Sequence, residues 1–304
     1  MPAVIVNELV KKYGSKKETV EALKGISFEV EQGELFGVIG PDGAGKTSLF
    51  RILTTLLLPD GGSATVDGFD TEKDYKQIRN RVGYMPGRFS LYHDLTVEEN
   101  LEFFATIFNT TINSNYDLIK DIYSQIEPFK KRKAGKLSGG MKQKLALSCA
   151  LIHRPSVLFL DEPTTGVDAV SRKEFWDMLK GLKAQGITIL VSTPYMDEAG
   201  LCDRIALMQN GKLLSMNTPG GVIAGFKHPL LAVKSPHMLK LLQTLKLFDG
   251  VEDAYPFGEY HHVALKKESD QKRLEQYLCE RADDISVVPA TPNIEDCFIA
   301  LMKN

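Results

Sequence analysis

The sequence lacks any apolar run near the length of about 18 residues that a membrane-spanning helix requires. The first residues, MPAVIVNELVKKYG, include a charged side chain by position 8 and contain no hydrophobic signal core. We therefore expect a cytoplasmic protein that reaches any membrane process through a partner.

Cysteine is scarce, and its spacing excludes the common metal and redox motifs. The four cysteines (Cys149, Cys202, Cys279 and Cys297) lie far apart, with no paired spacing of a zinc or redox site. Reduced thiols in the cytoplasm fit this pattern.

An excess of positive charge is also missing. The chain has 37 Lys and Arg against 39 Asp and Glu, a net charge of −2 and an isoelectric point of about 6.3. The basic runs at 11–12 and 130–133 are short, and we interpret them as solvated charged residues in loops. We therefore expect no nucleic-acid partner.

Hydrophobic patterning over the 304 residues predicts two domains. In the larger domain, continuous apolar runs of strand length predict buried parallel strands, and helix-spaced apolar positions separate them. Asn210-Gly211 is a hairpin signal. The predicted strands are 4–10, 26–31, 35–40, 157–163 and 187–192, and the helical patterns are 45–58, 97–127, 139–153 and 169–184.

Glycine and proline concentrate at 217–229, which we interpret as a linker between the domains. The order of elements in 230–304 is β-α-β-β-α-β followed by a last helix, which suggests a ferredoxin-like module. This region shows no cluster of titratable residues. A structural, docking or dimer-supporting role is the default interpretation.

The strongest local motif is GPDGAGKT, which fits G-x-x-x-x-G-K-[ST] between a predicted strand and a predicted helix. Backbone N–H groups of such a loop wrap phosphates at a helix N-terminus. Lys46 is expected to reach the β- and γ-phosphates and Thr47 to bind Mg²⁺. The nucleotide-binding residues predicted here are Gly40, Pro41, Asp42, Gly43, Ala44, Gly45, Lys46, Thr47 and Ser48.

Two acidic residues end the apolar run VLFLDEP. We expect Asp161 to hold Mg²⁺ directly or through water, and Glu162 to polarise an attacking water. An acidic pair after a strand is often only a capping turn, so the P-loop is what makes this interpretation strong.

A third motif, LSGGMKQK, opens a predicted helix 23 residues before Asp161. Ser138, Gly139 and Gly140 form an anion-binding arrangement at a helix N-terminus. Taken alone, the motif is better interpreted as a serine N-cap followed by flexible glycines.

Together, GPDGAGKT, LSGGM and LFLDEPTTGVD resemble the ATP-binding subunit of an ABC transporter over residues 1–216. The ending TPNIEDCFIALMKN is similar, more loosely, to the C-terminal extension of bacterial exporter ATPases with a separate permease. The resemblance implies an α/β P-loop cassette with a mixed sheet, an antiparallel β subdomain and a helical subdomain near 88–155. It also implies cofactors ATP and Mg²⁺, a permease partner at the inner membrane face, and a second cassette.

The resemblance assigns further roles. Tyr13 matches the aromatic residue that stacks on adenine, although it could simply be a half-buried tyrosine at a strand end. Asp168 matches the residue that bridges two cassettes. In this family, ATP on one P-loop is covered by the LSGGM helix of the other chain.

Two positions depart from the family where hydrolysis is carried out. Gly87 replaces a glutamine that contacts Mg²⁺ and water, and Pro194 replaces a histidine that faces the γ-phosphate. Asp42 replaces the usual asparagine, a milder change. Pro194 could be the first residue of a helix with Thr193 as its N-cap, and His93 is a conceivable substitute base.

We therefore expect slow hydrolysis in the chain's own site and an intact signature that serves a partner's site. A heterodimer with a complete cassette is the favoured hypothesis. The alternatives are a fully active homodimeric exporter subunit and a soluble regulatory or non-transport ABC protein.

Overall fold

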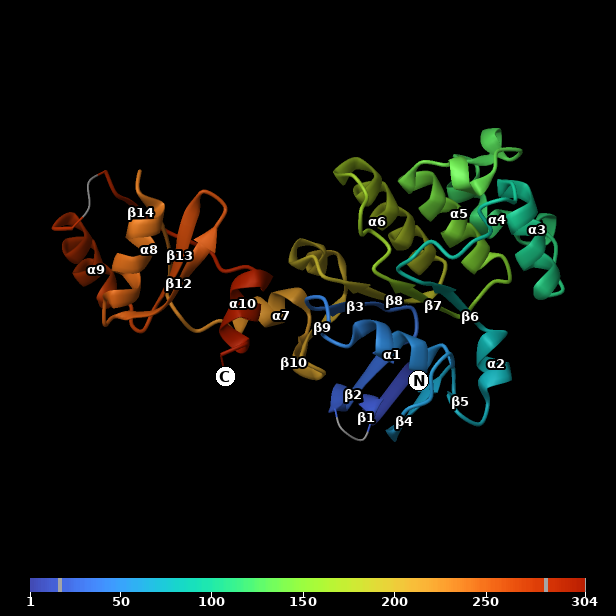
Figure 1. Cartoon of the computed structure of the whole chain (residues 1–304), viewed down its shortest axis with the longest axis horizontal. Helices are drawn as coiled ribbons and strands as arrows, with labels where there is room; N and C mark the ends of the chain where they lie inside the picture. Colours follow the sequence, from blue (N-terminus) through green and yellow to red (C-terminus); the bar gives the residue numbers. More distant parts are fainter. Residues whose placement is uncertain (16–17, 282–283, 304) are drawn as a thin grey trace. The chain divides into compact units, whose positions relative to one another are not determined.

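The computed structural model describes residues 1–15, 18–281 and 284–303. The chain divides into two compact units, Met1–Pro219 and Gly220–Asn304. The segment predicted as a linker, 217–229, contains the short helix α7, Pro219–Ala224 (Figure 1).

The first unit begins with an antiparallel sheet of strand order β2-β1-β4-β5. Its first two strands are much longer than the predicted 4–10 and 26–31, because they pair along nearly their whole length and absorb several register shifts. Alternate residues, such as Val4 and Val6, are buried. The strands are β1 Pro2–Ser15, β2 Glu18–Glu31, β4 Gly61–Val66 and β5 Phe69–Asp70.

A second, six-stranded sheet has the order β10-β9-β3-β8-β7-β6. All neighbouring pairs are parallel except β10 with β9, which form the hairpin predicted at Asn210-Gly211. Both turn residues have positive φ, 48° and 78°. The strands are β3 Leu35–Ile39, β6 Val82–Met85, β7 Val157–Asp161, β8 Thr188–Thr193, β9 Arg204–Gln209 and β10 Lys212–Asn217.

Helix α1, Lys46–Leu53, packs between the two sheets. Its buried Leu49 and Phe50 join a core that includes residues of β1, β2, β3 and β7. The predicted helix 45–58 was too long at its C-terminal end. Thr55 adopts a left-handed φ of 62°, and the N–H groups of residues 56 and 57 turn back to the carbonyl of Arg51.

A group of helices is inserted between β6 and β7, and Figure 1 shows α3, α4 and α5 lying together. The helical pattern predicted over 97–127 is broken by Asn109, whose φ is 51°. Helix α6 connects β7 to β8, as predicted. The helices that follow α1 in the first unit, up to β8, are α2 Tyr75–Arg79, α3 Val97–Ile107, α4 Tyr116–Tyr123, α5 Gly139–Leu151 and α6 Ala169–Ala184.

The second unit carries an antiparallel sheet of order β12-β13-β11-β14 with β-α-β-β-α-β connectivity, as in a ferredoxin-like fold. Leu241, Leu245 and Leu274 cover one face of the sheet. No helix in the described residues is long and apolar enough to span a membrane. The elements are β11 Leu230–Lys234, α8 Met238–Leu247, β12 Val251–Phe257, β13 Tyr260–Leu265, α9 Asp270–Cys279, β14 Ser286–Pro289 and α10 Ile294–Leu301.

Candidate nucleotide site

Several of the predicted functional positions lie at the ends of four neighbouring parallel strands. The order β3-β8-β7-β6 places the carboxyl ends of these strands at one edge of the sheet. The P-loop follows β3, Pro194 follows β8, Glu162 follows β7 and Gly87 follows β6. This edge is where open α/β sheets bind ligands.

Close backbone approaches explain two P-loop glycines. A Cβ on Gly40 would lie 2.1 Å from the carbonyl oxygen of Met208. Gly45 has a φ of 108°, and a Cβ there would lie 2.3 Å from the carbonyl oxygen of Ala22. Helix α1 then begins at Lys46, so the N–H groups of its first turn have no partner within the helix. These groups suit an anion.

Lys46 is held at the centre of this loop. Its ammonium donates to the carbonyl oxygens of Gly40 and Pro41 at 2.7 and 3.0 Å. It also lies 3.1 Å from Oε1 of Glu162, and its side chain is only 3% exposed. The P-loop cation and the predicted general base are therefore in direct contact.

The acidic pair at the end of β7 is fixed by Ser192 of the adjacent strand β8. The Ser192 hydroxyl donates to Oδ1 of Asp161 at 2.6 Å. The N–H of Glu162 is 3.0 Å from both the hydroxyl and the carbonyl oxygen of Ser192. Glu162 has a left-handed φ of 49°, a costly conformation for a residue with a Cβ. Burial and the Asp161 carboxylate raise the pKa of Tyr84, on β6, to about 12.

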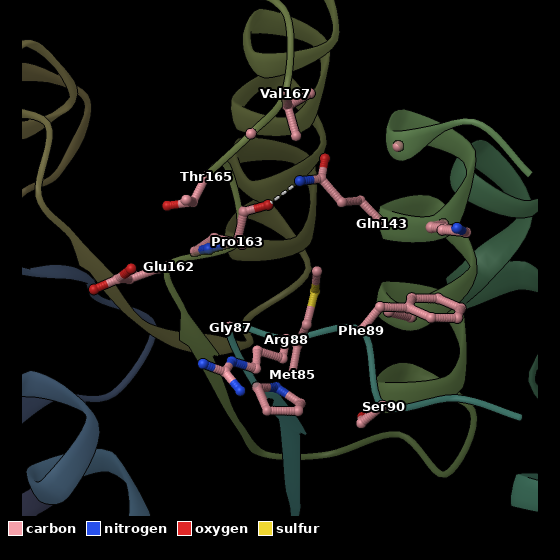
Figure 2. A pocket seen from close by; sticks show the side chains of 15 residues that line it. Met85, Gly87, Arg88, Phe89, Ser90, Gln143, Glu162, Pro163, Thr165 and Val167 are labelled. Atoms are coloured by element: carbon pink, nitrogen blue, oxygen red, sulfur yellow. Dashed lines mark hydrogen bonds between the residues drawn. The ribbon is translucent and has the colours of Figure 1, made fainter. Parts of the chain in front are cut away.

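Gly87 lies against the same acidic pair. A Cβ on Gly87 would be 3.0 Å from the carbonyl oxygen of Asp161, so the loop after β6 runs close to the turn after β7. Figure 2 shows the cavity that this loop forms with Glu162 and with Gln143 of α5, whose side chain donates to the carbonyl oxygen of Pro163.

The predicted role of Thr193 as a helix N-cap before Pro194 was wrong. The next helical segment is a 3₁₀ helix, Met196–Leu201, and its N-cap is Tyr195. The Thr193 hydroxyl donates to Oε2 of the buried Glu198 at 2.6 Å and accepts the N–H of Tyr195. These bonds turn the chain directly after β8, so the helix begins two residues later and Pro194 lies in the bend.

His93 lies apart from the acidic pair. Its ring is edge-on to Phe89, with ring centroids 5.1 Å apart, and its carbonyl oxygen accepts the N–H of Gly135. It is not among the residues that line the cavity at Glu162. The position gives no support to a role for His93 as a substitute base.

The LSGGM segment starts α5 with Ser138 as its N-cap, whose hydroxyl accepts the N–H of Met141 at 3.4 Å. Ser138 and Gly139 are exposed. Asp168 caps α6 in the same way, accepting the N–H groups of Val170 and Ser171, and these bonds lower its pKa. Both capping segments therefore remain accessible at the surface of the unit.

The predicted adenine-stacking residue is exposed. The Tyr13 side chain is on β1, and its hydroxyl lies 3.1 Å from Oγ of Ser48 on α1. Asp42 and Gly43 are also exposed, whereas Thr47 is half-buried in the first turn of α1. The hydroxyl contact holds the ring at the P-loop helix.

A model of the ABC transporter family matches residues 23–165. The daunorubicin resistance ATP-binding protein DrrA2 of Streptomyces coeruleorubidus is 32% identical over 311 residues, covering 98% of this chain and 94% of that protein. The chain belongs to the ABC transporter ATP-binding family. It is an ABC cassette with the P-loop α/β fold.

Two other relatives differ in how much of their length this chain covers. The probable multidrug ABC transporter ATP-binding protein YbhF of Escherichia coli (strain K12) is 40% identical over 304 residues. That match covers 98% of this chain but only 52% of YbhF, so the chain spans about half of that relative's length. NatA of Bacillus subtilis (strain 168), an ABC transporter ATP-binding protein, is 34% identical over 215 residues, covering 69% of this chain and 87% of NatA.

A solved structure of an ABC cassette resembles most of this chain. The dimeric cassette MJ0796, in a post-hydrolysis state bound to ADP and Pi, matches with a TM-score of 0.64 and 25% identity over 71% of this chain and 98% of its own. Members of the family bind ATP or ADP and form dimers of cassettes.

Ser192 and Glu198 were missed by sequence reasoning, although both fix the site. A polar residue within the apolar run ITILVS was the available signal for Ser192, because a buried hydroxyl in a strand needs a partner. The sequence has no comparable signal for Glu198.

Proposed function

We propose that this chain is the ATP-binding subunit of an ABC-type export system. It binds MgATP at its P-loop, dimerises with a second cassette and donates its LSGGM segment to the partner's ATP, while its own site hydrolyses slowly. The observation that carries the proposal is the contact between Lys46 and Glu162 at the shared edge of four parallel strands. The names of two relatives, a probable multidrug ABC transporter ATP-binding protein and a daunorubicin resistance ATP-binding protein, support export.

The donors at this edge fit MgATP. Magnesium in nucleotide sites is usually held by one or two protein oxygens together with phosphates. Asp161 is already oriented by Ser192, and Thr47 places a hydroxyl in the first turn of α1. Lys46 would meet the β- and γ-phosphates.

Slow hydrolysis follows from the side chains at two loops. Gly87 has no side chain that could bind Mg²⁺ or accept a hydrogen bond from a water. The side chain of Pro194 cannot donate or accept a proton. Water-positioning or proton-handling groups typically contribute about 10²–10⁴ in rate. The residues that bind phosphate and metal are all retained, so binding is expected to persist while turnover falls.

The partner's site is where this chain contributes to catalysis. Ser138 and Gly139 are exposed at the N-terminus of α5, a position suited to the phosphates of a second chain. A homodimer would then have two impaired sites. A heterodimer with a complete cassette would have one competent site, completed by this chain, and we favour that arrangement.

An apolar cavity of about 570 Å³ in the first unit supports a permease partner. It lies between the strand β6, the helix α3 and the helix α5, with His153 at one side. Such a cavity suits a short apolar segment of another protein. Its apolar lining is Leu56, Val82, Tyr84, Met85, Leu91, Phe104, Ile107, Phe108, Ala146 and Ala150. We propose that the permease docks here and holds the chain at the inner face of the membrane.

Co-expression tests the proposal. The chain is expressed with the cassette and the membrane protein encoded beside it, and the membrane fraction is assayed for the chain. The proposal expects recovery of a complex containing both, and loss of the chain from membranes when the membrane protein is omitted. Recovery of a homodimer alone, with ordinary ATP turnover, would contradict it.

A further inference from the structure

Arg88 is a cation beside the position where glycine replaces the family's glutamine. Its side chain is exposed, and no hydrogen bond or ion pair joins its guanidinium to another residue in the described ranges. Two buried charged side chains at this edge of the sheet have partners: Lys46 meets Glu162, and Asp161 meets Ser192. The guanidinium at 88 therefore needs an explanation.

The backbone brings Arg88 next to the acidic pair. A Cβ on Gly87 would contact the carbonyl oxygen of Asp161 at 3.0 Å and Cβ of Glu162 at 3.7 Å. The Cα of Arg88 is one trans peptide, about 3.8 Å, beyond that contact. The long side chain of Arg88 thus starts one residue beyond the place from which the family's glutamine would start.

The side chain also points toward the nucleotide side. Arg88 and Glu162 line one cavity of about 160 Å³. Figure 2 shows the Arg88 guanidinium and the Glu162 carboxylate directed to the same side, away from α5. That side is the one on which Lys46 meets Glu162, so it faces the P-loop.

The chemistry of the guanidinium group indicates which kind of ligand Arg88 can bind. A guanidinium has five donors and no acceptor, so it cannot replace glutamine as a ligand of Mg²⁺ or as an acceptor for water. It is well suited to bidentate binding of phosphate oxygens. A terminal phosphate extending from the P-loop past Lys46 is the anion that this side of Glu162 would meet.

We propose that Arg88 contacts the γ-phosphate of ATP bound to this chain's own P-loop. This inference rests on the proposed function and deepens it. The contact favours ATP over ADP, because only ATP carries the phosphate that Arg88 reaches. It strengthens binding without positioning a water, so the site retains ATP rather than turning it over.

The cavity provides a matched control. Lys142 lines the same cavity from α5, and its ammonium lies over the Phe89 ring, 5.6 Å from the ring centroid. Removing Lys142 changes the charge of the cavity by the same amount as removing Arg88. It leaves the proposed phosphate contact in place.

The test compares equilibrium binding of Mg²⁺ with a β,γ-imido analogue of ATP and with ADP to the full chain. Arg88→Ala is expected to weaken analogue binding about tenfold, the value of one charge-assisted hydrogen-bonded contact, while ADP binding changes less than about twofold. Arg88→Lys should fall between these, and Lys142→Ala should match the wild type.

Two results separate the possible failures. Equal weakening for both nucleotides, or no change in Arg88→Ala while the wild type binds tightly, would overturn the role of Arg88 alone. A wild-type chain that binds neither nucleotide would overturn the proposed function as well.

Discussion

The ammonium of Lys46 lies 3.1 Å from a carboxylate oxygen of Glu162, joining the P-loop after β3 to the turn after β7. One residue is expected to bind phosphate and the other to activate water. Their contact means that the phosphate-binding and catalytic loops are positioned by the same sheet edge. Substitutions at this edge should therefore separate nucleotide binding from hydrolysis.

Lys46→Ala is expected to weaken ATP and ADP binding by at least about tenfold, because a buried charge that meets phosphate is lost. Fluorescence titration with labelled nucleotides measures this, and circular dichroism checks the fold. Lys142→Ala serves as the cation control. Unchanged affinity in a folded Lys46→Ala protein would show that nucleotide does not bind at this loop.

The double variant Gly87→Gln, Pro194→His is expected to raise ATP turnover of the isolated chain by about tenfold to a hundredfold, since both missing groups return. Gly87→Gln alone should give less, because only one of the two missing groups returns; in both variants its Cβ meets the Asp161 carbonyl at 3.0 Å, so the loop must shift slightly. Steady-state phosphate release is the assay. Adding Glu162→Gln should remove the gain, and a gain that survives it would point to another base.

Tyr13 offers a way to separate ring stacking from hydroxyl bonding. Tyr13→Phe loses the exposed contact with Ser48 and should keep nucleotide affinity within about twofold. Tyr13→Ala removes the ring and should weaken binding about fivefold to tenfold. Titration with ATP and with inorganic triphosphate, which has no adenine, provides the control. Equal effects of Tyr13→Ala on both ligands would exclude adenine stacking.

The buried side chain of His153 is expected to make the free energy of unfolding depend on pH. Burial lowers its pKa from 6.5 to about 4, while its Nε2 lies 3.1 Å from the carbonyl oxygen of Val82 and its ring stacks on Phe108. The neutral form is favoured in the folded state, so its contribution is full above pH 6.5 and is lost as the pH falls toward 4. The loss is at most about 3 kcal/mol.

Urea unfolding between pH 7.5 and 4.5 measures this contribution. The wild type should lose stability below pH 6.5 more steeply than His153→Gln, which retains a donor for Val82 but does not titrate. Parallel pH profiles for the two proteins would contradict the assignment.

Much of the fold was predictable, because its signals are local. The P-loop spacing, the apolar strands β7 and β8 and the Asn210-Gly211 hairpin each follow from neighbouring residues. The end of α1 at Leu53 did not, since Leu56, Leu57 and Leu58 continue a helical pattern that the left-handed Thr55 interrupts. That interruption depends on carbonyl groups several residues away.

The sequence indicates candidate residues for the site but not the contacts between them. Lys46, Asp161 and Glu162 were found from motifs, whereas the bond from Ser192 to Asp161 depends on the register of β7 against β8. The bond from Thr193 to Glu198 likewise replaced the predicted N-cap. Pairing between strands distant in sequence leaves no local pattern, so these contacts required the structure.

The most direct test of the central claim is ATP turnover by this chain alone and mixed with the cassette encoded beside it. Two variants report on different sites: Glu162→Gln removes the base of this chain's own site, and Ser138→Arg blocks the signature offered to the partner. We expect slow turnover by the chain alone, and turnover by the mixture that survives Glu162→Gln but is lost with Ser138→Arg. Fast turnover by the isolated chain that Glu162→Gln abolishes would contradict it.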